Sequence, residues 1–114
     1  MFTKNKYDEY ELVINDIRFV CDSAEDGLED TATKIAAIYE SKVVVIANYM
    51  LEKGLSDYFG DLYPGQVLAS LGKPTIDLDR CLLMYLEQAF DDTHIIEIEY
   101  AGMLDEFYYL NIDG

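Results

Sequence analysis

The segment Leu28–Met50, LEDTATKIAAIYESKVVVIANYM, decides the fold expected for this chain. Apolar residues recur along it at intervals of three or four, which is the spacing of one face of an α-helix. The members of this apolar stripe are Leu28, Ala32, Ile35, Tyr39, Val43, Ile46 and Met50. The sequence therefore predicts one long helix whose single apolar face packs against another layer.

Residues with known capping preferences mark the ends of this helix. Ser23 is the predicted N-cap, because its side-chain oxygen can accept a hydrogen bond from the free N–H groups of the first turn. Gly54 and Gly60 each favour a C-terminal stop. The run Val43–Ile46 is β-branched and stiff, so a break near Glu40–Lys42 is an alternative to one continuous helix.

The segments on either side of the helix have a different character. Glu11–Asp22 reads ELVINDIRFVCD, which is rich in β-branched and aromatic residues. It predicts a strand, or a hairpin if Asn15 and Asp16 form a turn. Further on, Pro64 suits the first position of a helix and Gly72 suits its end. A second, short helix is therefore predicted between these two residues.

After Pro74 the chain changes to short β-rich runs separated by turn residues. These runs are Thr75–Asp79, Leu82–Gln88, Thr93–Tyr100 and Met103–Ile112. Short connections between strands are typical of an antiparallel meander. The predicted fold class is α+β, with an antiparallel meander sheet of about four or five strands packed against one long helix, broken or continuous, and one short helix. Residues 1–114 are expected to form a single domain, the default for this length.

The third of these runs has a clear alternation. Ile96, Ile98 and Tyr100 alternate with Glu97 and Glu99. Successive side chains of a strand point to opposite faces, so this pattern predicts one buried face and one solvated acidic face.

The fourth run is apolar on both faces. In a regular strand Phe107 and Tyr109 share one face, and Tyr108 and Leu110 share the other. This pattern predicts either a central strand or a strand whose aromatic face is exposed for a partner.

Acidic side chains dominate the charge of this chain. Its 23 Asp and Glu residues face 8 Lys and Arg residues, which gives a formal net charge of −15 at pH 7. With 51% hydrophobic and 13% aromatic residues, the chain is expected to be a folded acidic domain and not a disordered acidic tail. The charge repels phosphates and so argues against direct binding to nucleic acid or to anionic membranes. It favours a basic protein as the partner.

Two groups of carboxylates are the candidate contacts for such a partner. One group lies at the predicted start of the long helix and comprises Glu25, Asp26, Glu29 and Asp30. The other group lies around the third β-rich run and comprises Asp91, Asp92, Glu97 and Glu99. Tyr100 and Tyr108 are the candidate anchors, because tyrosine offers a large contact area with little loss of rotamer freedom. A solvated helix start and a solvated strand face are the alternatives for these acids.

Two acidic patterns raise the alternatives of metal binding and of acid–base catalysis. His94, the single histidine, shares a strand face with Asp92, but Glu97 would point to the opposite face. Two ligands do not make a metal site, so no metal is expected. Asp77 and Asp79 also share a strand face, where a desolvated pair could perform acid–base catalysis. The same pattern is typical of a solvated sheet edge, which is the favoured interpretation.

The chain has no phosphate-binding loop, zinc-protease motif or nucleophile elbow, so it is not expected to be an enzyme or to bind a cofactor. Cys21 and Cys81 do not have metal-ligand spacing and are expected to be reduced thiols, with a disulfide as the alternative. The polar segment Met1–Tyr10 has no apolar core of a signal peptide, and no run approaches the ~20 apolar residues of a membrane helix. These features predict a cytoplasmic protein.

Three segments carry a resemblance to a known group of proteins. They are LGKPTIDLDR at Leu71–Arg80, YLEQAFDDTHIIEIEY at Tyr85–Tyr100 and FYYLNIDG at Phe107–Gly114. Together they resemble small acidic bacterial immunity proteins of polymorphic and contact-dependent toxin systems. The resemblance implies a role as a stoichiometric inhibitor that covers the active site of a toxin. It also implies a basic partner such as a nuclease, whose own surface binds phosphates.

The function expected from the sequence is therefore that of a non-enzymatic acidic binding protein that neutralises a basic partner. Three alternatives belong to other classes. The first is a structural or regulatory domain that forms a homodimer through its aromatic sheet face. The second is a DNA mimic that occupies a nucleic-acid-binding protein. The third is a small metal-dependent enzyme built around His94.

Overall fold

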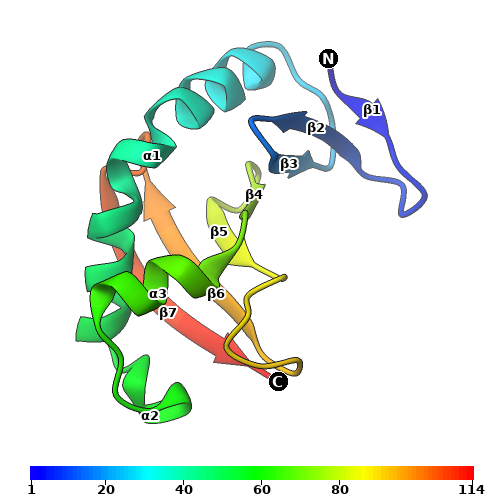
Figure 1. The fold of residues 1–114 in the computed structure, drawn as a ribbon. Helices are drawn as coiled ribbons and strands as arrows, with labels where there is room; N and C mark the ends of the chain where they lie inside the picture. Colours follow the sequence, from blue (N-terminus) through cyan, green and yellow to red (C-terminus); the bar gives the residue numbers. More distant parts are fainter.

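One β-sheet runs through the molecule, and helices cover one of its two faces (Figure 1). The computed structural model describes residues 1–114. Its strands are β1 (Thr3–Lys4), β2 (Tyr10–Ile14), β3 (Ile17–Cys21), β4 (Thr75–Asp77), β5 (Leu82–Tyr85), β6 (Ile95–Ala101) and β7 (Glu106–Asp113). Its helices are α1 (Leu28–Glu52), α2 (Ser56–Phe59) and α3 (Pro64–Leu71). The α+β class predicted from the sequence is confirmed.

The sheet is larger than predicted and is not purely antiparallel. It has seven strands in the order β1-β2-β3-β4-β5-β6-β7, which corrects the expected four or five. All neighbouring strands are antiparallel except β3 and β4, which are parallel. The three helices lie between β3 and β4 in the chain, and a parallel neighbour requires such a crossover. Periodicity reports which face of a strand is buried, and it does not report which strand lies beside it.

The first two main strands form the hairpin that was one of the two predicted alternatives. Ile14 pairs with Ile17, so Asn15 and Asp16 make a two-residue turn. Their φ angles are 53° and 67°, as a type I′ turn requires at both central positions. Asn and Asp tolerate this left-handed conformation better than other residues with a side chain, which explains why the chain turns here.

Helix α1 is continuous from Leu28 to Glu52, without the break considered near Glu40–Lys42. It begins later than predicted. Gly27, with φ of 90°, occupies the N-cap position, and Ser23 donates its hydroxyl hydrogen bond to the Glu25 carboxylate and not to the backbone of the helix. Glu25 and Asp26 therefore precede the helix.

The apolar stripe of α1 packs against one face of the sheet. Its buried residues are Ala32, Ile35, Ala36, Tyr39, Ile46, Ala47 and Met50. Opposite them, Phe19, Ile76, Leu83 and Ile98 lie in register across four neighbouring strands and are fully buried. Burying each of these large side chains contributes about 1.5–3 kcal/mol relative to exposure, so this row is a main source of stability.

The short helix α3 confirms the prediction between Pro64 and Gly72. Pro64 is its first residue, and Gly72 ends it with a φ of 71°. A buried hydrogen bond also joins the helical layer to the sheet. It is formed between the hydroxyls of Tyr39 on α1 and Tyr85 on β5. Burial raises the pKa of Tyr39 to about 12 and raises the pKa of Tyr85 as well, so both hydroxyls stay neutral at physiological pH.

Strand β7 is interrupted by a β-bulge at Tyr108. Tyr109 pairs with Glu99 and Phe107 pairs with Tyr100, which leaves Tyr108 without a residue opposite. The extra residue shifts the alternation, so Phe107 and Tyr109 lie on opposite faces and not on the same one. The Phe107 ring packs at a tilt of 44° against Tyr49 of α1, with ring centroids 5.6 Å apart.

The bulge accounts for the apolar pattern on both faces of this segment. Strand β7 lies at the edge of the sheet, so the prediction of a central strand was wrong. The alternative prediction, exposed aromatic residues, agrees with the structure, because Tyr108 and Tyr109 are both exposed.

Candidate functional site

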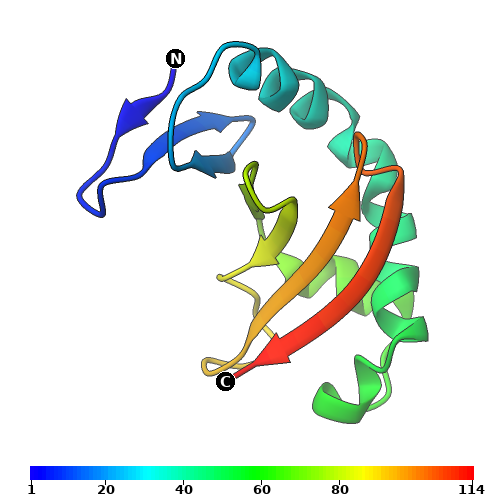
Figure 2. The ribbon, with the colours of Figure 1, turned by 180° about the vertical axis from the view of Figure 1, so that it is seen from behind.

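The face of the sheet that no helix covers carries acids and tyrosines on its last two strands. In Figure 2, β6 and β7 lie in front of α1 and α3, so the view is onto this open face. Burial of Ile96, Ile98 and Tyr100 against the helices leaves the alternate residues of β6 on the open face. We define the acid–tyrosine surface as Glu97, Glu99, Glu106, Tyr108 and Tyr109.

The pairing of β6 with β7 places these side chains side by side. Glu99 lies directly across from Tyr109, and Glu97 lies across from Asn111. The Asn111 side-chain amide donates a hydrogen bond to Glu97 Oε1 at 3.3 Å. The Tyr108 hydroxyl donates to Glu106 Oε2 at 2.7 Å, and this bond to a carboxylate raises the pKa of Tyr108. The surface is thus a set of ordered polar groups on regular backbone.

Both tyrosines of this surface are largely exposed. Tyr108 is 59% exposed and Tyr109 is 55% exposed. Tyrosines are enriched at protein–protein interfaces, where the ring is buried and the hydroxyl finds a polar partner. Two neighbouring rings with this exposure offer apolar area that a partner could cover.

The carboxylates of the acid–tyrosine surface have no compensating cations. Neither β6 nor β7 contains Lys or Arg. Six of the 8 Lys and Arg side chains form ion pairs with acids elsewhere in the chain. Glu97, Glu99 and Glu106 have no ion-pair partner, so the surface carries a local excess of negative charge.

A second group of acids surrounds Arg80 where β3 and β4 end. Arg80 Nη1 lies 2.8 Å from Asp77 Oδ2, and Arg80 Nη2 lies 3.5 Å from Asp22 Oδ2. The other oxygen of Asp77 accepts hydrogen bonds from the backbone N–H groups of Asp79 and Arg80 at 3.0 and 3.1 Å. Asp77 is buried on the central strand β4 and Asp79 lies in the turn after it, so the favoured prediction that both lie at a solvated sheet edge was wrong. Both oxygens of Asp77 are used, one by the turn and the other by the ion pair with Arg80.

The negative field of this second group acts on a nearby thiol. Burial raises the pKa of Cys21, and the carboxylates of Asp79, Asp22 and Asp77 raise it further, in that order. A raised pKa disfavours the reactive thiolate. Cys21 and Cys81 are both free, Cys21 being buried and Cys81 exposed.

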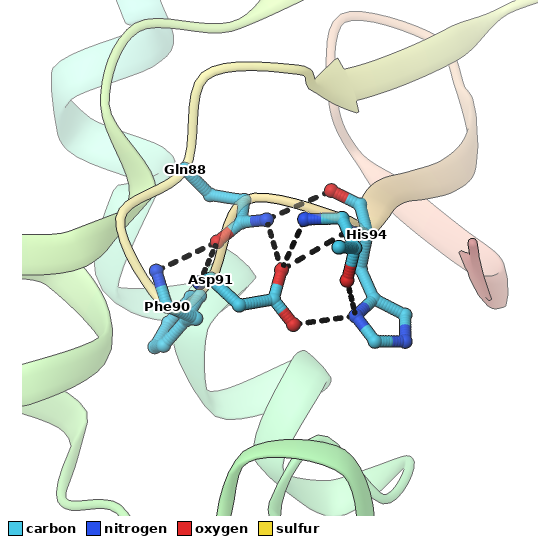
Figure 3. A network of polar contacts seen from close by, with 5 residues as sticks. Gln88, Phe90, Asp91 and His94 are labelled. Atoms are coloured by element: carbon cyan, nitrogen blue, oxygen red, sulfur yellow. Dashed lines mark hydrogen bonds and ion pairs between the residues drawn. The ribbon is translucent and has the colours of Figure 1, made fainter.

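A compact polar network organises the loop between β5 and β6 (Figure 3). Asp91 Oδ1 accepts hydrogen bonds from the backbone N–H groups of Thr93 and His94 and from the Gln88 side-chain amide, at 3.1, 3.0 and 3.2 Å. Its Oδ2 contacts Nδ1 of His94. The Gln88 amide also donates to the His94 carbonyl at 2.8 Å and accepts from the Phe90 N–H.

The same loop packs on α2 through aromatic rings. Phe90 stacks on Phe59 with centroids 4.8 Å apart, and the His94 ring meets Phe59 edge-on at 5.6 Å. His94 and Asp92 were expected to share a strand face, but both precede β6, and the contact to the His94 ring is made by Asp91. No group of three or more His, Cys, Asp or Glu side chains is arranged to hold a metal ion. The arrangement around His94 is that of a loop fixed to its neighbours.

Asp91 should make stability depend on pH. Chiefly the N–H of His94, and also its ring and the Gln88 amide, hold the pKa of Asp91 well below its usual range. A lowered folded-state pKa stabilises the protein above the unfolded value of about 3.9, and this contribution is lost as the pH falls through the folded-state value. We expect Asp91→Asn to lower the melting temperature at pH 7, and the difference from the wild type to shrink below about pH 4. Thermal melts between pH 7 and pH 3 measure this, and a constant difference would exclude a role for the charge.

The structure does not bring the predicted helix-start acids together as one helical patch. Glu25 and Asp26 lie in the exposed loop after β3. Glu29 and Asp30 lie in the first turn of α1 and are already paired, Glu29 with the terminal ammonium at 2.7 Å and Asp30 with Lys34 at 3.0 Å.

The sheet residues predicted as contacts are divided between three places. Glu97, Glu99 and Tyr108 belong to the acid–tyrosine surface, and Asp92 is exposed in the loop before β6. Asp91 is committed to the loop network described above. Tyr100 is only 5% exposed and faces the helices, so it is part of the core and unavailable as an anchor.

Sequence reasoning missed Tyr109 and Glu106. Strict alternation placed Tyr109 on the face of Phe107, and only the bulge turns it outward. The run Phe107–Leu110 was the available signal for the bulge. Four consecutive apolar residues, three of them aromatic, rarely fit a regular strand at the edge of a sheet.

A shallow hollow of about 360 Å³ lies between α1 and α3. Its walls are mostly apolar, with Val43, Leu68 and Leu71 among them. At its rim Lys73 pairs with Glu40 at 3.5 Å, so the charged groups there neutralise each other. The hollow contains no converging set of polar groups that would orient a ligand.

Comparison of the chain with family models, with curated proteins and with solved structures finds no match. None of the helices combines the length and the apolar character needed to cross a membrane.

Proposed function

We propose that this chain is a non-enzymatic acidic binding protein that captures a basic protein through the acid–tyrosine surface. The observation that supports this most directly is the placement of two exposed tyrosines beside three carboxylates that have no cationic partner. The rings supply apolar area, and the carboxylates supply complementarity to Lys and Arg. Because these groups lie on paired strands, little order has to be gained on binding.

The net charge of −15 adds a long-range attraction for basic proteins to the local contacts of this surface. A large charge of one sign speeds the encounter with a partner of opposite charge, and the rate then falls as salt screens the field. The same charge disfavours a direct interaction with nucleic acid. The partner is therefore a basic protein, whose own cationic groups take the place of counterions.

The resemblance to immunity proteins gives this binding a specific role. We propose that the partner is a basic toxin domain such as a nuclease, and that the chain acts in the cytoplasm by covering the basic active site of that toxin. Such an inhibitor needs no catalytic group and no cofactor. It needs a tight interface of the size that specific complexes usually have, about 800 Å² on each partner.

The test uses the protein encoded in the neighbouring reading frame, co-expressed with this chain. We expect a one-to-one complex whose association rate constant falls at least tenfold between about 0.02 M and 0.5 M salt, because the Debye length shortens over that range. Stopped-flow kinetics on the separated partners measures the rate. If the two proteins form no complex, or if the rate does not change with salt, capture by electrostatic attraction is wrong.

A further inference from the structure

The two edges of the sheet differ in how they are protected from other strands. At one edge, β1 is only two residues long, Thr3–Lys4, and Lys6 follows it closely. Short length and lysines are the usual devices that prevent an edge from pairing with another chain. At the other edge, β7 is eight residues long and contains neither Lys nor Pro. The edge formed by β7 is the open one.

The outer backbone groups of β7 are unpaired. The strand has β6 as its only neighbour, and none of the backbone hydrogen bonds outside helices and strands involves Glu106–Asp113. Alternate N–H and C=O groups of an edge strand point away from the sheet. The bulge at Tyr108 interrupts this edge, so the regular part is Tyr109–Asp113, which pairs with Ile95–Glu99.

We infer that the basic partner adds a β-strand to the edge Tyr109–Asp113, and that this strand alternates basic and apolar residues. This inference rests on the proposed function and specifies how the partner binds. Main-chain hydrogen bonds would pair the free N–H and C=O groups of the edge. Alternate side chains of the added strand would contact opposite faces of the sheet.

The chemistry of each face fixes the alternation. On the open face, an added strand would lie next to Tyr109 and Asp113, with Glu97 and Glu99 one strand further, about 10 Å away. Long Lys or Arg side chains can cross that distance by lying over a tyrosine ring, where they also gain a cation–π contact. On the helix side, the new strand would extend the half-buried row of Leu110 and Ile112, so its residues there should be apolar.

A second copy of this chain is a poor occupant of the same edge. In antiparallel self-pairing about Asn111, the second Asp113 would lie opposite Tyr109, with Glu99 one strand further, and neither copy has a cation on β7. Each copy would also bring a net charge of −15 to the interface. Like charges across a strand pair are destabilising, so the edge favours a basic chain.

The experiment uses synthetic nine-residue peptides with alternating Lys and Val, titrated into the full chain and followed by the backbone amide resonances of β7. Two further peptides carry N-methyl groups on either the Lys or the Val residues, which removes every second N–H donor. In a strand, alternate N–H groups face the neighbouring edge. We expect at least one methylated peptide to bind tenfold or more weakly than the parent, and a peptide of the same composition with its lysines grouped together also to bind more weakly.

The outcomes separate this inference from the proposed function. If both methylated peptides bind within twofold of the parent while Glu97→Lys with Glu99→Lys weakens binding, strand addition is wrong and capture of a basic partner stands. If the lysine peptide binds no better than one with serine in place of lysine, both proposals fail. Sedimentation of the free chain gives a further test: we expect a monomer, and a dimer in which the amides of β7 are protected from exchange would show that a second copy occupies the edge.

Discussion

Replacing Phe19 by alanine is expected to lower the free energy of unfolding by about 3–5 kcal/mol. Phe19 lies in the middle of β3, is fully buried, and pairs in register with Leu12 on one side and Ile76 on the other. Truncation leaves a cavity in the row of side chains on which α1 packs, and the surrounding strands cannot close it without breaking their register. Equilibrium unfolding in denaturant measures the change.

Tyr109→Ala is the matched control, because it removes a similarly large aromatic side chain from the open face. We expect this variant to unfold within about 0.5 kcal/mol of the wild type, as is usual for an exposed position. If Tyr109→Ala lowers the free energy of unfolding by several kcal/mol, the Tyr109 ring stabilises the fold and is not a free contact for a partner. A small loss for Phe19→Ala would contradict the description of the core.

Reversing the two open-face charges of β6, with Glu97→Lys and Glu99→Lys together, is expected to slow association with the basic partner at least tenfold at low salt. The change replaces two attractive groups by two repulsive ones at the centre of the proposed interface, and on-rates respond strongly to such charges. Stopped-flow kinetics at several salt concentrations measures this effect, which should diminish as salt is added.

The control for this variant reverses two acids on the helical side of the molecule. Asp57 on α2 and Asp61 just after it are exposed and have no ion-pair partner, and Asp57→Lys with Asp61→Lys changes the net charge by the same amount. We expect this control to slow association less than threefold. Equal effects of the two double variants would mean that total charge, and not the acid–tyrosine surface, governs the encounter.

Local patterns of the sequence predicted the parts of the fold that depend on neighbouring residues. The apolar stripe from Leu28 to Met50 identified α1, and Asn15 with Asp16 raised the hairpin as one of two alternatives, which the structure confirms. The start of α1 was misplaced because Ser23 has the chemistry of a cap, yet its hydroxyl bonds to Glu25 and the left-handed Gly27 begins the helix.

The arrangement of the strands depends on contacts that no local pattern records. The parallel pairing of β3 with β4 joins segments on either side of all three helices, so nothing near either segment could report it. The short strand β1 was missed for a related reason. Thr3 and Lys4 are extended only because they pair with Glu11 and Tyr10.

The candidate site could be predicted in part. The alternation of β6 placed Glu97 and Glu99 on a solvated face, and that face is open in the structure. The same alternation placed Tyr100 in the core, so its choice as an anchor conflicted with its own pattern. Strict alternation could not place Tyr109 on the open face. The bulge at Tyr108 puts Phe107 and Tyr109 on opposite faces of the sheet, whereas alternation puts them on the same face. Asp91 was predicted as a partner contact because of its charge. In the structure its carboxylate accepts hydrogen bonds from the N–H groups of Thr93 and His94 within its own loop.

Amide hydrogen exchange, compared between the free chain and its complex with the basic partner, tests the central claim most directly. If the partner binds the acid–tyrosine surface, the amides of Glu106–Asp113 should exchange more slowly in the complex, and those of the loop Asp22–Gly27 should be unchanged. Protection confined to Asp22–Gly27 and the first turn of α1, with β7 exchanging as in the free chain, would contradict the account.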